Sequence, residues 1–268
     1  GRIGYMKGGG KALWKDENIE DSILSHAMKF IDKHKKEPFF MYFAANDVHV
    51  PRFPHERFRG KNPMGVRGDA IVQFDWTVGQ LLKKLHELKI DYNTLVFLTS
   101  DNGPVVDDGY QDRAEELLNG HSPAGPFRGN KYSAFEGGTA VPFIVSWPRK
   151  IKGGVMSKAL VSQIDLLSSL GSLVHARFPK GSAPDSRNYL PTILGSDQKG
   201  RDYVIGQSNT HVLSVLTPQY RYIEPSNGPK MIQWGPKIET GNLPVPQLYD
   251  MTISPYETNN VAAEHPDE

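Results

Sequence analysis

Asp101 and Asn102 are the residues of this 268-residue chain whose types and position first suggest chemistry. They follow the apolar run 95–98 after Thr99 and Ser100, and they precede Gly103, which lets the backbone turn away at any φ. Carboxylate and amide oxygens are hard donors that suit Ca²⁺ or Mg²⁺ better than a soft metal. The same three residues are also common in turns, so an ordinary strand-to-loop turn is the alternative interpretation.

More polar side chains follow another apolar run or lie in one long loop. The apolar run 39–45 leads into His49, and a histidine in that place can act as a general acid, although most loop histidines are only hydrogen bonded. The polar stretch 104–140 is long for a loop inside a compact domain, and such loops are usually functional or disordered. Its candidate polar residues are Asp108, Tyr110, His121, Arg128 and Lys131.

The spacing of apolar residues predicts the elements that must position these side chains. A period of three to four residues indicates amphipathic helices, the first with Asp16 as its N-cap and Pro38 after its end. Helices are predicted at 16–36, 69–88 and 162–174. Continuous apolar runs are typical of strands covered on both faces. Such strands are predicted at 39–45, 95–98 and 141–147.

The order of these elements favours an α/β fold, with a mostly parallel sheet flanked by helices. Ligands of such sheets bind at the carboxyl ends of the strands, where Asp101 and His49 would lie. Residues 175–200 are rich in Gly, Pro, Ser and Lys, so we predict two domains, 1–195 and 196–268. Shorter runs in the second domain predict a small antiparallel sheet, with strands near 202–206, 211–216, 220–223 and 247–249.

Composition excludes several classes of function. The formal charge is +1, so nothing in the charge balance calls for nucleic acid or an anionic membrane as a partner. No apolar run approaches the roughly 18 residues of a membrane span. The absence of cysteine excludes disulfides, thiolate metal sites and a cysteine nucleophile within these residues. The chain begins at Gly1 without an initiator Met or a signal-peptide core, so we expect an excised piece of a longer protein.

Five short sequence blocks stand out along the chain. They are 39–51 with His-Val-Pro, 99–103 (Thr-Ser-Asp-Asn-Gly), 128–138 from Arg-Gly-Asn-Lys to Phe-Glu-Gly-Gly, 142–148 (Pro-Phe-Ile-Val-Ser-Trp-Pro), and 247–260 with Pro-Tyr-Glu-Thr-Asn-Asn. Each block alone is a weak signal, but together and in this order they resemble the sulfatase family of the alkaline-phosphatase-like superfamily. The resemblance covers nearly the whole chain and implies an enzyme that hydrolyses sulfate esters, by family habit those of carbohydrates.

The resemblance also implies roles for particular residues. Asp101 and Asn102 match the later pair of ligands to one Ca²⁺ ion, with Mg²⁺ as the alternative. Lys131 matches the lysine that reaches the sulfate oxygens, and His49 matches the histidine that contacts the sulfate and acts as a general acid. The remaining candidates lie on loops where substrate selectivity would be determined. They are the substrate-binding candidates Arg128, His121, Asp108 and Tyr110.

The chain departs from the family pattern at the nucleophile. Sulfatases use a formylglycine made from Cys or Ser in a Cys-x-Pro-x-Arg type motif, and they take their first metal aspartates from an early strand. Residues 182–187 resemble the motif but have one residue too many before the Arg. We therefore expect the C-terminal portion of a sulfatase, inactive alone, with exposed sheet surface that could self-associate. Family habit places such enzymes in the periplasm, outside the cell or in lysosomes.

Two other functions fit part of the pattern. A non-catalytic binding module of the same fold would also lack the nucleophile and the early aspartates. A phosphatase or phosphodiesterase of the same superfamily would bind two Zn²⁺ or Mn²⁺ ions through several His and Asp ligands. The Asp101–Asn102 pair with a lysine nearby favours one hard ion instead.

Overall fold

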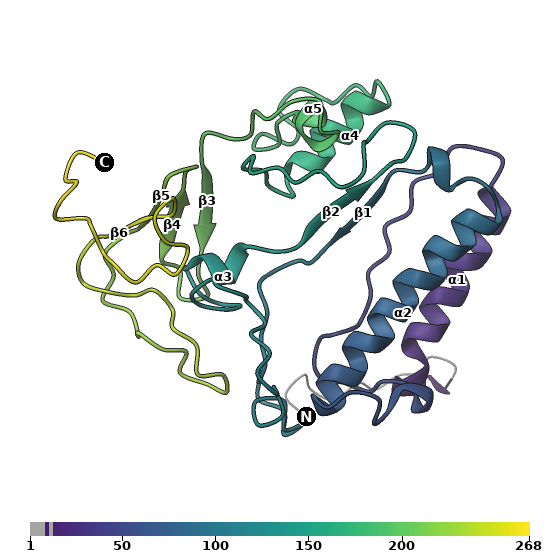
Figure 1. Cartoon of the computed structure of the whole chain (residues 1–268), viewed down its shortest axis with the longest axis horizontal. Helices are drawn as coiled ribbons and strands as arrows, with labels where there is room; N and C mark the ends of the chain where they lie inside the picture. The colour runs from purple at the N-terminus through teal and green to yellow at the C-terminus, as the bar shows by residue number, and fades with distance from the viewer. Residues whose placement is uncertain (1–8, 11–12) are drawn as a thin grey trace. The chain divides into compact units, whose positions relative to one another are not determined.

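The computed structural model describes residues 9, 10 and 13–268, which form two compact units (Figure 1). The first unit comprises the described residues up to Thr94, together with Val106–Ser122 and Trp234–Pro236. The second comprises Leu95–Val105, Pro123–Gln233 and Lys237–Glu268. The predicted domain boundary between residues 195 and 196 falls inside the second unit. No helix in the described part of the chain is long and apolar enough to cross a bilayer.

Two helices that lie side by side form the centre of the first unit (Figure 1). They are α1 (Ile19–His34) and α2 (Gly65–Glu87). Their apolar stripes are buried at positions such as Ile31 and Ala70, both fully inaccessible to solvent. Both predicted helices are therefore confirmed. The first begins after a 3₁₀ turn, η2 (Asp16–Asn18), so the predicted N-cap lies in that turn and not at the start of the α-helix.

The second helix begins four residues before its predicted start, and Asp69 explains the difference. Its buried carboxylate accepts hydrogen bonds from the backbone N–H groups of Gly60, Lys61 and Asn62, at 2.8, 2.9 and 3.0 Å. A buried carboxylate is tolerated when such donors satisfy it. Asp69 therefore does not start the helix but holds the preceding loop, which includes part of the turn after η3 (Glu56–Phe58), against it.

The predicted strand at residues 39–45 is wrong. These residues have no partner strand in the described part of the chain, and a strand exists only as a member of a hydrogen-bonded ladder. Exposure alternates along the segment, and Phe40 and Tyr42 are 74% and 84% exposed. The apolar run identifies a segment that is suited to a sheet, but the run alone does not supply the neighbouring strand.

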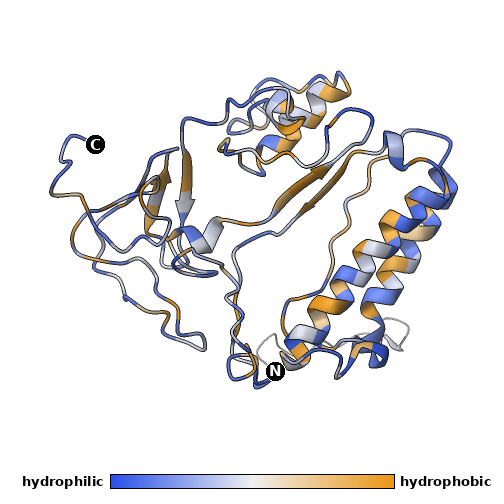
Figure 2. Cartoon of the chain, viewed as in Figure 1, coloured by the Kyte–Doolittle hydropathy of each residue, from blue (hydrophilic) through white to orange (hydrophobic). Residues whose placement is uncertain are grey.

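The second unit contains a two-stranded ladder of β1 (Val96–Thr99) and β2 (Phe143–Ser146). Both strands were predicted, and the apolar residues along them are apparent in Figure 2. They pair antiparallel, however, and all other ladders of the described residues are antiparallel too, so the mostly parallel sheet is not among them. Continuous apolar patterning indicates cover on both faces and says nothing about the direction of the neighbouring strand.

A four-stranded antiparallel sheet forms the C-terminal part of the second unit, as predicted. Its strands, in spatial order, are β3 (Val204–Gln207), β4 (Leu213–Leu216), β5 (Tyr220–Ile223) and β6 (Gln247–Asp250). Phe135 and Ala134, from the long polar loop, are buried in one cluster with Ile223 and Tyr249 of this sheet. The core of the C-terminal sheet therefore extends to the loop that carries Lys131.

Three short helices complete the second unit: α3 (Glu136–Thr139), α4 (Asp165–Leu173) and α5 (Leu190–Ile193). The predicted helix at 162–174 is confirmed as α4, whereas α5 lies within the stretch that was predicted to be a boundary. Asp165 is buried in a fork with Arg201, with N–O distances of 2.7 and 2.6 Å. This pair connects α4 to the residues that lead into the C-terminal sheet.

Candidate functional site

The loop that follows β1 carries Asp101 and Asn102 and is held on both sides. The Ser100 carbonyl accepts a hydrogen bond from Gln163 Nε2 at 2.6 Å, and the Gly103 N–H donates to the Gly138 carbonyl at 2.9 Å. A Cβ at position 103 would lie 1.9 Å from the backbone oxygen of Gly137, so only glycine fits there. The structure therefore places the predicted metal pair at the end of a fixed strand, as the sequence indicated.

Asn102 has the most informative side chain of this loop. Its Oδ1 is buried and has no hydrogen-bond partner among the described residues, whereas Asp101 is exposed. A buried amide oxygen without a partner is uncommon and needs an explanation, such as an ion or a water molecule. The oxygen donors of both residues suit a hard cation.

Lys131 lies in a loop that is hydrogen bonded to the loop of Asp101 and Asn102. Its N–H donates to the Pro104 carbonyl at 2.8 Å, and its Nζ lies 5.3 Å from the centroid of the Tyr132 ring. The loop closes on itself because the Gly137 N–H donates to the Arg128 carbonyl at 2.8 Å. The structure thus brings Lys131 into the same local assembly as Asp101 and Asn102, which lie about 30 positions earlier in the sequence.

Arg128 makes contacts that favour a positioning role over the predicted contact with substrate. Its Nε and Nη2 donate to the two carboxylate oxygens of Glu239, at 2.7 and 3.0 Å, and its Nη1 donates to the Glu257 carbonyl at 2.7 Å. Its Cζ also lies 4.0 Å from the centroid of the Phe135 ring. The hydrogen bonds between Arg128 and Glu239 raise the pKa of Arg128 and lower that of Glu239.

Two fully buried charged residues, Arg221 and Glu257, support the same loop and were missed from the sequence. Arg221 donates from Nη1 to the Ala134 carbonyl at 3.1 Å and pairs through Nη2 with the Glu136 carboxylate. Burial raises the pKa of Glu257 to about 7, although the Arg221 charge and the Glu136 N–H both act to lower it. The closing block Pro-Tyr-Glu-Thr-Asn-Asn contains Glu257, so the signal was present but carried no role.

His49 lies in the first unit, on the segment after the predicted strand. It is exposed, and its Nδ1 donates a hydrogen bond to the Val50 carbonyl at 2.6 Å. Since a carbonyl can only accept, Nδ1 carries a proton, and the neutral ring would present Nε2 as its acceptor. The segment contains two cis peptide bonds, Asp47–Val48 and Val50–Pro51.

Side chains from other parts of the first unit hold this segment. Gln73 of α2 donates to Asp47 Oδ2 at 2.7 Å, and burial raises the pKa of Asp47. Arg52 donates from Nη1 to Asp112 Oδ2 at 2.5 Å and from Nη2 to the Val106 carbonyl at 3.0 Å. The segment that carries His49 is therefore joined to residues 106–122, where three further candidates lie.

Those three candidates differ in exposure: Asp108 is buried, Tyr110 is half-buried and His121 is exposed. They belong to the first unit with His49, whereas Asp101, Asn102, Lys131 and Arg128 belong to the second.

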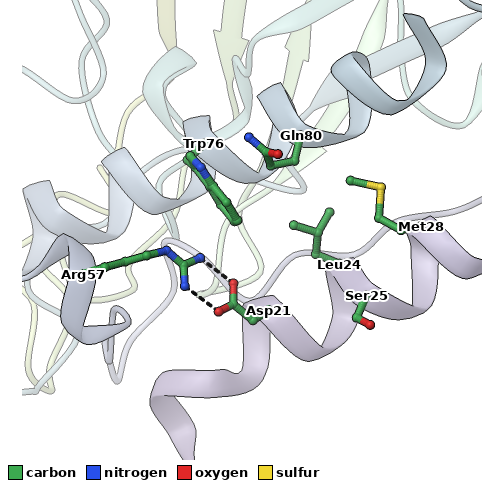
Figure 3. A pocket seen from close by; sticks show the side chains of 7 residues that line it. All are labelled: Asp21, Leu24, Ser25, Met28, Arg57, Trp76 and Gln80. Carbon is green, nitrogen blue, oxygen red and sulfur yellow. Dashed lines mark hydrogen bonds and ion pairs between the residues drawn. The ribbon is translucent and has the colours of Figure 1, made fainter. Parts of the chain in front are cut away.

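A cleft of about 410 Å³ in the first unit lies between α1 and α2 (Figure 3). No predicted site residue lines it, and its polar end is an Arg57–Asp21 fork with two distances of 2.6 Å.

The described residues offer few grouped side chains as metal ligands. Among residues 9, 10 and 13–268, no group of three or more His, Cys, Asp and Glu side chains could hold a metal ion. Asp101 and Asn102 would supply two oxygen donors, whereas Ca²⁺ takes six to eight. The donor set fits a hard cation in type but gives only part of its coordination shell.

Comparison with known proteins gives consistent matches. The Sulfatase family model matches residues 5–176. An N-acetylgalactosamine-6-O-sulfatase of Bacteroides thetaiotaomicron is 52% identical over 266 residues, which is 99% of this chain and 52% of that protein. A solved structure from work on the metabolism of multiple glycosaminoglycans by Bacteroides thetaiotaomicron is 51% identical to this chain, with a TM-score of 0.94. The match covers 97% of this chain and 54% of the other chain.

A more distant structure supports the fold alone. A sulfatase from a Pseudoalteromonas species has a TM-score of 0.75 at 23% identity, over 91% of this chain and 48% of that one. The chain thus spans about half the length of the relatives it matches. The match over residues 5–176 agrees with the five ordered sequence blocks and with the hydrogen-bonded loops of Asp101, Asn102 and Lys131. The chain belongs to the sulfatase family.

Proposed function

We propose that the protein containing this chain hydrolyses the sulfate ester of a carbohydrate, with 6-O-sulfated N-acetylgalactosamine as its substrate. The hydrogen bond from the Lys131 N–H to the Pro104 carbonyl carries the proposal, because it joins the predicted sulfate-binding lysine to the Asp101–Asn102 loop. The substrate is argued from the Bacteroides relative, which is 52% identical across 99% of the chain and is named for that activity.

In this proposal Asp101 and Asn102 hold one Ca²⁺ ion, with Mg²⁺ as the alternative. The unpartnered, buried Oδ1 of Asn102 supports this assignment, since a cation would satisfy it. The bound ion would supply positive charge to neutralise sulfate oxygens. Its remaining ligands would come from residues outside this pair.

Lys131 and His49 take complementary roles in the proposed reaction. A sulfate ester is anionic and repels nucleophiles, so its oxygens must be neutralised and its leaving alcohol protonated. Lys131 provides a fixed positive charge for the oxygens. His49 has a protonated Nδ1 bonded to the Val50 carbonyl, which orients the ring so that Nε2 can carry the proton for the leaving alcohol.

The nucleophile is proposed to lie outside residues 1–268. The chain contains no cysteine, and residues 182–187 have the wrong spacing for a formylglycine motif. We therefore expect residues 1–268 alone to be inactive. The sequence encoded before Gly1 tests this directly: a Cys-x-Pro-x-Arg type motif with an aspartate pair supports the enzyme, and their absence supports a binding module.

The experiment uses the full-length protein with free N-acetylgalactosamine 6-sulfate, the 4-sulfate isomer and an aryl phosphate. We expect sulfate release from the 6-sulfate and, after removal of metal with a chelator, recovery of activity with Ca²⁺ but not Zn²⁺. Turnover of the phosphate ester with Zn²⁺ would instead indicate the phosphatase alternative. Binding of the sulfated sugar without turnover of either isomer would indicate a non-catalytic module.

A further inference from the structure

The second unit contains a cluster of charges, built around the buried side chains of Arg221 and Glu257, that none of the proposed catalytic roles uses. It comprises two guanidinium groups and three carboxyl groups, from Arg128, Arg221, Glu136, Glu239 and Glu257. With all groups ionised the cluster has one negative charge in excess. The Glu257 side chain, at 0% exposure, is the most deeply buried of the five. Tyr249 of β6 also faces the cluster.

Glu257 contacts both ends of the loop that carries Lys131. Its main-chain carbonyl accepts from Arg128 Nη1 at 2.7 Å, at the beginning of the loop. Its carboxylate Oε2 accepts from the Glu136 N–H at 2.9 Å, near the end of the loop. Its Oε1 lies 3.2 Å from Arg221 Nε, close enough for an ion pair but without hydrogen-bond geometry.

The backbone of Glu257 adopts a conformation that costs free energy. Its φ is +50°, in the left-handed region that residues with a side chain seldom adopt. Such a conformation persists only where surrounding contacts determine it, and functional sites are a common location. From this position the Glu257 carbonyl accepts from Arg128 and its side chain accepts from the Glu136 N–H, so both parts of the residue contact the loop.

The loop between those two contacts connects to the proposed site at Lys131, and Gly138, two residues after the second contact, connects to it again. Lys131 bonds to the Pro104 carbonyl, and the Gly138 carbonyl accepts from Gly103. We infer that Glu257 is a positioning residue that, through Arg128 and Glu136, holds Lys131 against the Asp101–Asn102 loop. The inference rests on the proposed function. Glu257 acts only through these neighbours and touches neither the substrate nor the metal.

A double-mutant cycle on the full-length protein tests the inference. Glu257→Ala is expected to lower kcat/KM for the sulfate ester roughly tenfold to a hundredfold, since small misplacements of a catalytic group have effects of that size. On a Lys131→Ala background the same change should lower it no more than about twofold, because residues that act as a unit are not additive. Glu264→Ala, an exposed carboxylate in the same C-terminal segment, is the matched control.

The conservative variant separates positioning from general support of the fold. Glu257→Gln keeps an acceptor for the Glu136 N–H and leaves the main-chain carbonyl for Arg128, so it should restore kcat/KM to within about threefold of wild type. Glu257→Gln also serves as the test if the alanine variant does not fold. A hundredfold loss in kcat/KM from Glu257→Gln, both in the wild type and on the Lys131→Ala background, would overturn the inference.

Amide hydrogen exchange provides a readout that does not depend on catalysis. In Glu257→Ala we expect faster exchange at Gly103, Lys131 and Gly137, with little change in β3 and β4. Equal acceleration throughout the C-terminal sheet, or none in the loop, would contradict a positioning role. Absence of sulfatase activity in the wild type would overturn the proposed function, whereas unchanged exchange in the variant would overturn the positioning role itself.

Discussion

The segment that carries His49 and the loop that carries Lys131 are supported in different ways. Lys131 lies in a loop whose backbone groups bond to Pro104 and, through Ala134, to Thr240 of the C-terminal region. The segment before His49 has no partner strand among the described residues and exposes Phe40 and Tyr42. Side-chain hydrogen bonds to α1, to α2 and to residues 106–112 hold its far end, and Phe39 at its near end contacts the Phe30 ring of α1.

This difference shows that the loop of Lys131 is packed against a core, whereas the segment of His49 is held mainly by polar contacts. The loop of Lys131 is fixed by packing, because Phe135 of that loop lies in the core that includes Tyr249. The surroundings of His49 consist of polar contacts, among them those of Asp47 and Arg52, next to a segment with an open apolar face. We therefore expect substitutions in the second unit to have well-defined local effects that can be compared with changes in the first.

The largest expected effects are on catalysis. In the full-length protein, Lys131→Ala should lower kcat/KM by about a hundredfold to a thousandfold, the range found when a preorganised group that stabilises developing charge is removed. His49→Ala should produce a comparable loss that diminishes for esters with acidic leaving alcohols, because these need no protonation. Steady-state assays with alkyl and aryl sulfates measure both.

A result in which both variants respond equally to the leaving group would remove the distinction between the two roles. Lys150→Ala is the control for Lys131, since Lys150 is exposed and lies after β2 in the same unit. Activity within twofold of wild type is expected for it.

A matched pair of glycine substitutions compares the packing of the two units. Gly103→Ala should destabilise the protein by about 3 kcal/mol or more, because its Cβ would lie 1.9 Å from the fixed backbone oxygen of Gly137. Gly79→Ala in α2 should stabilise it by roughly 0.5–1 kcal/mol, because the new Cβ meets nothing within 4 Å and alanine favours the helix. Chemical denaturation measures both changes.

Equal destabilisation by the two alanines would mean that the close approach at Gly103 relaxes without cost. Loss of Ca²⁺ affinity should accompany Gly103→Ala alone, because Gly103 adjoins the proposed metal pair. Calorimetric titration with Ca²⁺ checks this second consequence.

The pH dependence of stability should reveal Glu257. Burial raises its pKa to about 7, from 4.5, so the folded protein retains a proton that the unfolded chain has lost. This contribution to stability is full below pH 4.5 and declines as the pH rises to about 7, by about 3 kcal/mol in total. Glu257→Gln should lack the decline. Denaturation of both proteins between pH 4.5 and 8 measures the difference.

A wild-type curve parallel to that of Glu257→Gln would mean that the pKa of Glu257 is the same in the folded and the unfolded protein. The opposite slope, with stability rising with pH only in the wild type, would mean that the ion pair with Arg221 outweighs burial. Glu264→Gln, an exposed site in the same segment, should follow the wild-type curve.

The sequence predicted most of the helices, the short strands and the antiparallel C-terminal sheet, but not the pairing of β1 with β2. Helical periodicity located α1 and α2, and the four short runs after residue 201 became the four strands of the C-terminal sheet. The direction of β1 and the state of residues 39–45 could not be predicted, because both depend on neighbouring strands and not on the pattern within a run.

The same limit applies to the site. Asp101, Asn102 and Lys131 were identified from residue type and resemblance, and the structure joins their loops. Arg221 and Glu257 were missed because a charged residue in a strand or a tail is usually exposed. Only the fold reveals that both are buried against the loop of Lys131.

The smallest expected effect concerns the Asp21–Arg57 fork at the end of the first-unit cleft. Its geometry is bidentate, with both distances 2.6 Å, but each side chain is about one-third exposed, at 34% and 35%. The hydrogen bond from Arg57 lowers the pKa of Asp21, and solvent screens much of the attraction. Asp21→Asn should therefore cost less than about 1 kcal/mol of stability at pH 7, measured by denaturation. A loss as large as that expected for Gly103→Ala would show that the first unit depends on this pair, and that the contrast between the two units is weaker than their hydrogen bonds suggest.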